Sequence, residues 1–332
     1  MNINLLRHNV QTTLLRGCFN MLMAVLCLVV ASCDKDAPLL NVADDNAIGF
    51  QTAVETTTRA DQTDLERDGF SVWGGYVTSG AINNVFTGTT ISYDAVNGWT
   101  YSPAKYWVPG KVYNFFGVYP RPNETTVVPF LDNGNLYYTL DFNIPANAAT
   151  DLLVATPTSI TAAKPYPTVN MEFNHALSKI NINVQKNGAN DEDEVIVYSV
   201  SFNNIKRTGK FNSKTKQWGE TTAGTLIFSD LKKTLSHTEH TKVVSDKLLM
   251  PQEIAANSIQ LSIYYSIRTG SSIDFYTANA DLPVSTITQW DKQTIYTYNV
   301  TLGAAKNDIL FGVPEVQDWF DKLPIGGSII IQ

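Results

Sequence analysis

The stretch Ile48-Gly-Phe-Gln-Thr-Ala-Val-Glu55 indicates the class of fold, because apolar or β-branched residues alternate in it with small or polar ones. Ile48, Phe50, Thr52 and Val54 would share one face of an extended chain, and the residues between them would share the other. This period of two is typical of a β-strand with one buried face. The stretch therefore predicts a strand.

Comparable runs recur along the rest of the chain. They lie at Gly69–Val77, Val112–Tyr119, Leu136–Phe142, Leu177–Gln185, Val195–Asn203, Ser258–Ile267, Ser272–Ala278 and Thr294–Leu302. Turn signals separate them at Asn97-Gly98, Asp132-Asn133-Gly134, Asn187-Gly188 and Thr269-Gly270. Convincing amphipathic helices are missing, and Asp230–His240 is at best a short one. We predict an all-β protein built from antiparallel β-sandwiches.

A proline-rich stretch suggests where the chain divides. Residues 156–168 carry Pro157, Pro165 and Pro167 among small and hydroxyl residues, a composition that interrupts a strand ladder and stiffens a connection. This predicts an N-terminal sandwich over residues 60–167 and a C-terminal sandwich over residues 168–332. The acidic tract Asp191–Glu194 lacks the spacing and the glycine of a calcium loop, so we interpret it as a solvated hairpin tip and predict no metal site.

The N-terminus carries the features of an export signal. Arg7 and Arg16 precede a short apolar core, which ends in Val30-Ala31-Ser32-Cys33. The aliphatic-small-small-Cys pattern resembles the lipobox of bacterial lipoproteins. That resemblance implies a signal peptide over residues 1–32 and a lipid on Cys33, which would become the mature N-terminus. The alternative is an ordinary secretory signal followed by an incidental cysteine.

The remaining cysteines and the net charge argue against a disulfide and against nucleic-acid binding in the mature chain. Cys18 and Cys27 would leave with the signal peptide, so the mature chain would hold no disulfide. The loss of Arg7 and Arg16 would take the formal net charge from −7 to −9. An acidic chain has no electrostatic reason to bind nucleic acid, so membrane attachment would rest on the lipid of Cys33.

Catalytic motifs are not apparent. His237 and His240 lack the glutamate position of a zinc protease motif, and His175 is explained by a buried, hydrogen-bonded role. We find no phosphate-binding glycine loop, no nucleophile elbow and no cysteine nucleophile. We therefore predict a protein that is not an enzyme and that takes no cofactor.

An aromatic block at residues 97–120 is the most distinctive part of the chain. Trp99, Tyr101, Tyr106 and Trp107 could stack on sugars if their rings were exposed. The same block contains the strand Val112–Tyr119, and large rings commonly fill the interior of a sandwich. Core packing is the favoured interpretation, and glycan contact by Trp99 and Trp107 is the alternative.

Taken in order, these pieces resemble the fimbrillin family of Bacteroidetes, the type V pilins, and especially its minor-fimbrium-like branch. The pieces that carry the resemblance are Cys33, the strand Ile48–Val54 leading to Thr58-Arg59-Ala60, the block Trp99–Pro120, Asp151–Thr156, Phe173–Lys179, Leu249–Gln252 and Asp318-Trp319. They cover nearly the whole exported chain. The resemblance implies two transthyretin-like β-sandwich domains.

The resemblance also implies an assembly route. Residues 33–59 would be a propeptide, which an arginine-specific protease would remove by cutting between Arg59 and Ala60. This cut requires that Arg59 lie in an accessible loop, and Arg67 is the nearest competing site. Loss of the strand Ile48–Val54 would open a groove at a sheet edge, and a strand from the next subunit would fill it. Head-to-tail joining of this kind produces open fibres.

The C-terminal segment supplies the candidate donor strand. It is short, apolar and β-branched, and its candidate donor residues are Ile329, Ile330 and Ile331. The alternative donor segment is Ile309–Val316. The expected partners are other fimbrial subunits, the arginine-specific protease and, before cleavage, the outer membrane. The protein would be a stalk or simple tip pilin that serves adhesion to a ligand the sequence does not identify. The alternatives are an anchor subunit that keeps its lipid and a stand-alone glycan-binding surface lipoprotein.

Overall fold

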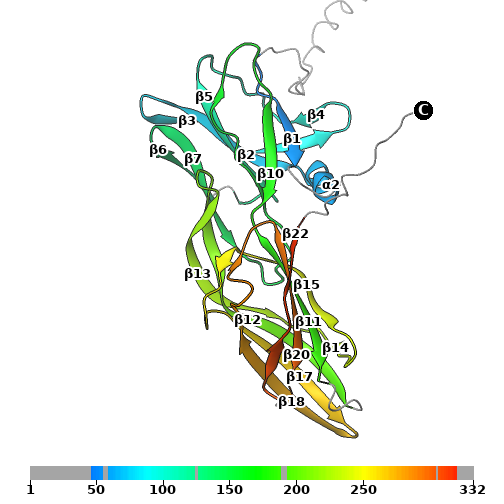
Figure 1. The fold of residues 1–332 in the computed structure, drawn as a ribbon. Coiled ribbons are helices and arrows are strands. Elements are labelled where there is room, and N and C mark those ends of the chain that lie inside the picture. Colours follow the sequence, from blue (N-terminus) through cyan, green and yellow to red (C-terminus); the bar gives the residue numbers. More distant parts are fainter. Residues whose placement is uncertain (1–45, 55–58, 124–125, 188–192, 304–305, 320–332) are drawn as a thin grey trace, which may run out of the picture.

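The computed structural model describes residues 46–54, 59–123, 126–187, 193–303 and 306–319, and these form an elongated molecule made almost entirely of strands (Figure 1). The predicted all-β class is therefore confirmed. Figure 1 shows an upper part that contains β1 and β10 and a lower part that ends in the β17–β18 hairpin. Among the described residues, no helix is long and apolar enough to cross a membrane.

Three large sheets and one small one account for the strands. The first sheet runs β1 (Phe50–Val54), β10 (Val169–His175), β8 (Leu153–Ala155), β5 (Val112–Tyr119), β2 (Phe70–Thr78), β3 (Ala81–Asp94) and β4 (Gly98–Thr100), with β9 (Ile160–Thr161) on β5. The second runs β18 (Ser272–Asp281), β17 (Gln260–Thr269), β12 (Glu194–Asn212), β7 (Asn135–Asn143) and β6 (Val127–Asp132), with β13 (Gln217–Phe228) and β14 (Lys233–Thr234) on β12. The third runs β15 (Thr241–Leu249), β11 (Ser178–Lys186), β20 (Thr294–Leu302) and β21 (Ile309–Phe311), with β22 (Glu315–Asp318) on β20. The small sheet pairs β16 (Gln252–Glu253) with β19 (Gln289–Trp290).

Two of the strand pairs are parallel, which the expected antiparallel arrangement did not include. β1 runs parallel to β10, with Phe50 opposite Val169, and β11 runs parallel to β20, with Lys179 opposite Ile295. In both pairs, long stretches of chain separate the partners, and only such long connections let two strands point the same way. All the other pairs between described strands are antiparallel, so the first and third sheets are mixed and the second is antiparallel throughout.

The central strand β5 of the first sheet is buried on both faces. On β5, Tyr113 and Phe115 point into a core shared with β1 and β10, whereas Phe116 and Val118 point into a second core that continues into the lower part. The Phe116 ring stacks on Tyr138 of β7, with 6.0 Å between the ring centroids. A strand buried on both faces has no polar side, which explains the nearly continuous apolar run of Val112–Tyr119.

The chain contains a helix that the sequence did not predict, and it begins at Arg59, where an accessible loop was expected. Helix α2 spans Arg59–Asp68 and buries Leu65 completely. Gly69 ends it at φ +69°, and the Gly69 N–H donates to the Leu65 carbonyl at 2.8 Å. Glycine fits this position because it adopts positive φ without strain. The short helix considered for Asp230–His240 is wrong, since that segment contains only the two-residue strand β14.

The described strands do not separate cleanly at residue 167. β9 and β10, on either side of that point, belong to the same first sheet. The hairpin β6–β7 belongs by sequence to the proposed N-terminal unit, yet β7 pairs with the end of the long strand β12. The division into residues 60–167 and 168–332 therefore stays a prediction, and β12 joins the two parts.

Candidate functional site

The predicted removable strand lies in a slot with partners on both sides. β1 pairs along its whole length with β10, and the Val169 N–H donates to the Gly49 carbonyl at 2.8 Å. On the opposite side, the segment before β1 pairs with the aromatic block. The Ile48 N–H donates to the Lys105 carbonyl at 2.8 Å, and the Trp107 N–H donates to the Asn46 carbonyl at 2.9 Å. We call this arrangement, with β10 on one side and Tyr101–Trp107 on the other, the β1 slot.

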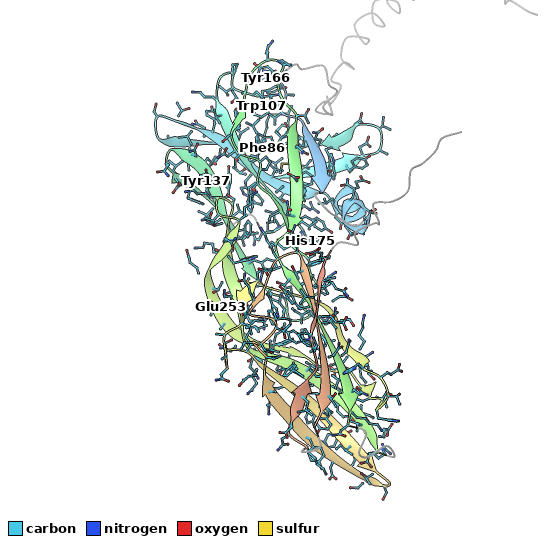
Figure 2. The ribbon with its side chains drawn as sticks, viewed as in Figure 1. Phe86, Trp107, Tyr137, Tyr166, His175 and Glu253 are labelled. Carbon is cyan, nitrogen blue, oxygen red and sulfur yellow. The ribbon has the colours of Figure 1, made fainter. Side chains whose placement is uncertain are left out.

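Aromatic rings surround the Phe50 side chain on the core side of the β1 slot. Phe50 makes edge-on contacts with Phe86, Tyr101 and Phe115, with centroid separations of 5.2, 5.7 and 5.9 Å. Ile48 is completely buried in the same core. Figure 2 shows Phe86 inside the upper part of the molecule. Edge-to-face contacts at these distances are the favoured geometry between aromatic rings, so the slot suits an aromatic side chain at position 50.

Side-chain hydrogen bonds hold the two ends of the segment. The Tyr101 hydroxyl donates to the Ile48 carbonyl at 2.7 Å, and burial raises the pKa of Tyr101 to about 12, which keeps this hydroxyl protonated. Near the other end, the Trp99 indole N–H donates to Thr52 Oγ1 at 3.0 Å. Thr52 also accepts a longer bond from Gln62 of α2 at 3.4 Å. The segment is therefore fixed by its backbone, its apolar face and these polar contacts together.

Most rings of the aromatic block lie in the interior, whereas Tyr106 is 43% exposed. Trp107 is only 2% exposed and packs edge-on against Tyr113, with 4.7 Å between the ring centroids. Figure 2 shows Trp107 in the upper part of the molecule. Trp99 is partly buried, packs against Phe70 at 5.0 Å and directs its N–H at Thr52. The favoured core interpretation agrees with these positions. Trp107 offers no open ring face to a sugar, and glycan contact by the partly buried Trp99 stays a prediction.

The bond from Tyr101 to the Ile48 carbonyl gives a direct test of the slot. Tyr101→Phe removes the hydroxyl and leaves the ring, so the intact chain should lose about 0.5–1.5 kcal/mol of unfolding free energy. Urea unfolding monitored by circular dichroism measures this. Tyr93→Phe is the control, because Tyr93 is exposed and should change stability by less than about 0.5 kcal/mol. Equal effects of the two variants would show that the hydroxyl of Tyr101 does not hold the strand.

The two candidate cleavage positions differ in their surroundings. Arg59 is the first residue of α2, not part of an accessible loop as the sequence suggested, and residues 55–58 before it lie outside the described residues. Arg67 lies in the last turn of α2, exposed, with its guanidinium within 2.7 Å of Asp64 Oδ1 and 2.5 Å of Asp68 Oδ2. Both arginines lie at an end of α2, and both ends of a helix fray, so cleavage after Arg59 stays a prediction.

Two further predicted sites cannot be placed. Cys33 and the donor candidates Ile329, Ile330 and Ile331 lie outside the described residues. The alternative donor, Ile309–Val316, is described and already belongs to the fold. It contributes β21 and the start of β22, and both strands pair with β20.

The structure also brings together residues that the sequence analysis did not connect. His175 is buried as predicted, and its Nδ1 lies 2.7 Å from Asp151 Oδ2. The His175 ring stacks on Trp319 at 4.2 Å, and Lys179 Nζ lies 4.1 Å above the same indole. Figure 2 places His175 where the upper and lower parts meet. Residues from three of the quoted sequence pieces thus form one cluster, at the last described residue of the chain.

Comparisons with known proteins agree with the fold. A family model described as fimbrillin-like matches residues 58–319. Among curated proteins, none matches. A solved structure of a candidate cell adhesion protein from Bacteroides ovatus is similar at 14% identity and a TM-score of 0.51, covering 83% of this chain and 98% of that chain. At this identity, the likeness supports a shared fold and nothing further.

Two other solved structures are similar over much of their length. A candidate cell adhesion protein from Bacteroides uniformis has 16% identity and a TM-score of 0.46, and the match covers 83% of this chain and 99% of that chain. One from Parabacteroides distasonis has 10% identity and a TM-score of 0.47, with 84% and 97% covered.

Proposed function

This chain belongs to the fimbrillin-like family, and from that membership we propose that it is a structural subunit, a stalk or simple tip pilin, of a bacterial surface fimbria that serves adhesion. A family of this kind belongs at the cell surface, assembles with other fimbrial subunits and has a structural rather than an enzymatic role. The finer steps of export, cleavage and strand exchange are part of the proposal. Export would use the lipobox at Cys33, and the lipid would hold the precursor in the outer membrane before cleavage.

The observation that carries the assembly route is the position of β1. It ends one side of the first sheet, and its chain leads to Arg59 and the start of α2. Cutting after Arg59 would sever β1 from the rest of the fold without breaking any other described strand. The uncovered edge of β10 and the rings around Phe50 would then form an apolar groove of the kind that accepts a strand by β-augmentation.

The two-sided β1 slot adds a requirement to this route. Because backbone bonds, side-chain bonds and the burial of Phe50 all hold the strand, cleavage alone would leave the N-terminal segment bound. An incoming donor strand would have to displace it, and it would have to run parallel to β10 to make the same ladder. The proposed order is therefore cleavage first and displacement second.

Arginine-specific digestion of the purified chain tests the proposal. The wild-type protein should give Ala60 as its new N-terminus and should then form filaments visible by electron microscopy. Arg59→Ala should abolish both results, whereas Arg67→Ala should leave both unchanged. Filaments whose subunits keep Cys33 as the N-terminus would contradict the cleavage step, and a subunit that is never cut in cells would instead fit a lipid-retaining anchor.

A further inference from the structure

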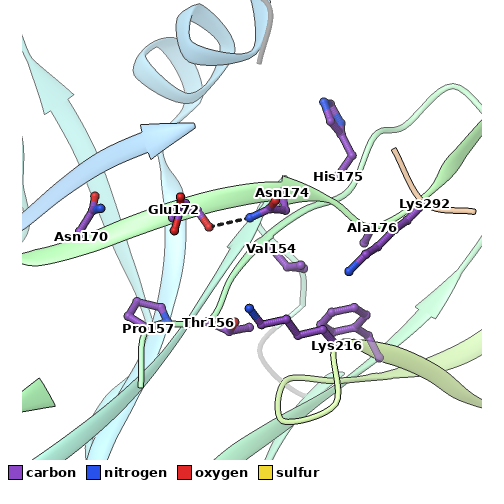
Figure 3. Close-up of a pocket in the computed structure, with 11 residues that line it drawn as sticks. Val154, Thr156, Pro157, Asn170, Glu172, Asn174, His175, Ala176, Lys216 and Lys292 are labelled. Carbon is purple, nitrogen blue, oxygen red and sulfur yellow. Dashed lines mark hydrogen bonds between the residues drawn. The ribbon is translucent and has the colours of Figure 1, made fainter. Parts of the chain in front are cut away.

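A cavity of about 180 Å³ lies beside β10, on the opposite face from the β1 slot. Its walls come from β8 and the chain after it, from β10, from the turn between β12 and β13, and from the chain before β20 (Figure 3). Neither Arg59 nor any residue of β1 lines it. The cavity is thus separate from the proposed assembly site.

Two lysines supply the positive charge of this cavity. Figure 3 shows the side chains of Lys216 and Lys292 reaching from different loops into the same space. Among the described residues, neither ammonium group has a carboxylate within 4.0 Å. Burial and, second, the positive charge of Lys216 lower the pKa of Lys292, so the two cations disfavour each other there. An anion placed between them would relieve this repulsion.

The remaining lining is polar at one end and apolar along the base. Asn170 and Glu172 project from the outward face of β10, since Val169, Met171 and Phe173 fill the inward face. Asn174 is fixed by neighbours, because its Nδ2 donates to the Glu172 carbonyl at 3.3 Å and its Oδ1 accepts from Gln293 at 3.0 Å. Val154, Pro157, Ala176 and Phe211 contribute apolar surface.

This lining fits a ligand with a carboxylate at one end and hydroxyl groups at the other. The Glu172 carboxylate would repel a simple dianion but accepts hydrogen bonds from hydroxyls, and the Asn170 amide can donate or accept them. The apolar base suits the C–H face of a pyranose ring. Sites for small molecules commonly combine an apolar lining with a few placed polar groups in this way.

We propose that this cavity binds an acidic sugar such as a hexuronic acid, with Lys216 and Lys292 holding the carboxylate and Glu172 and Asn170 contacting the hydroxyls. The site would give the molecule a binding activity that does not depend on strand exchange. It would be present before and after cleavage at Arg59, because no lining residue precedes Val154.

Calorimetric titration of the full-length protein with galacturonate tests the proposal. We expect saturable binding with a dissociation constant near or below about 1 mM, the range for a ligand of this size. Lys292→Met should weaken binding by about tenfold or more, because it removes a charged hydrogen-bond donor, and Lys292→Arg should retain part of it. Lys216→Gln, on an exposed turn, provides a second variant with little risk to folding.

Matched controls separate the site from general charge effects. Lys233→Met makes the same change of net charge on exposed β14, away from the cavity, and should leave affinity unchanged. Galactose, which lacks the carboxylate, should bind at least tenfold more weakly than galacturonate. Acetate that binds as tightly as galacturonate would overturn the sugar assignment. Absence of saturation with galacturonate, or equal losses in Lys233→Met and Lys292→Met, would overturn the site.

Discussion

Phe50→Ala is expected to destabilise the uncleaved chain by about 3–5 kcal/mol, the usual cost of removing a buried phenylalanine ring. The side chain is 6% exposed and touches three other rings, so its removal leaves a void among Phe86, Tyr101 and Phe115. Denaturant unfolding of the precursor measures the loss. Gln51→Ala, on the exposed face of the same strand, should cost less than about 0.5 kcal/mol.

The same variant distinguishes the precursor from the assembled subunit. If β1 is displaced during assembly, residue 50 is absent from the filament, so filaments grown from cleaved Phe50→Ala protein should melt at the wild-type temperature. The weaker hold on the strand should also speed filament growth after cleavage. A filament destabilised as much as the precursor would show that β1 remains in place, and strand exchange at the β1 slot would be rejected.

Deletion of residues 328–332 should abolish filament growth while leaving the subunit folded. Burial of Ile329, Ile330 and Ile331 in a neighbouring groove would contribute about 5–9 kcal/mol before the cost of association, at about 1.5–3 kcal/mol for each aliphatic side chain. Alternate residues of a strand face opposite ways, so the central isoleucine should contribute differently from its two neighbours. Electron microscopy of the Arg59-cleaved deletion variant measures growth, and circular dichroism checks the fold.

The control for this deletion is replacement of the same five residues by a Gly-Ser stretch of equal length, which keeps the reach of the chain and removes the side chains. Both variants should fail to polymerise. Normal filaments from either would assign the donor role to another segment. Ile309–Val316 is a poor substitute, because Ile309 is buried and β21 already pairs with β20, so its release would disrupt the third sheet.

The sequence predicted those strands whose burial leaves a pattern. Val112–Tyr119 and Thr294–Leu302 have the bounds expected from their apolar residues. The hairpin at Asp132-Asn133-Gly134 is likewise confirmed, with positive φ at both Asn133 and Gly134. By contrast, β13 went unnoticed. Most of its side chains are exposed, and it forms by pairing with β12, so no alternation marks it.

The candidate site was predicted only in its local features. Alternation at Ile48, Phe50 and Thr52 identified the strand and its buried face, and ring size favoured a core role for the aromatic block. The sequence could not predict that the aromatic block contacts this strand, because Thr52 and Trp99 come together only when the first sheet has formed. Periodicity reports what a residue faces, not which distant residue it meets.

The cluster of Asp151, His175 and Trp319 was missed for the same reason. Each residue was noted in its own segment, but no sequence spacing relates positions so far apart in the chain. The cavity with Lys216 and Lys292 also draws its lysines from separate loops. Such sites require tertiary structure, since only the packing of sheets brings their parts into contact.

The two parallel pairs also determine how early their strands can pair during folding. Phe50 of β1 can pair only after Val169 has been synthesised, more than a third of the chain later, and Lys179 can pair only after Ile295 has been synthesised. Contacts between residues so distant in sequence form slowly, because the entropy cost of closing the long loop between them comes before the contact stabilises the chain. A chain that emerges with its N-terminus first therefore carries the apolar strand Phe50–Val54 unpaired with β10 while more than a third of its length appears. During that interval the strand is open to pairing with other chains, and early protection by a chaperone would benefit this segment most.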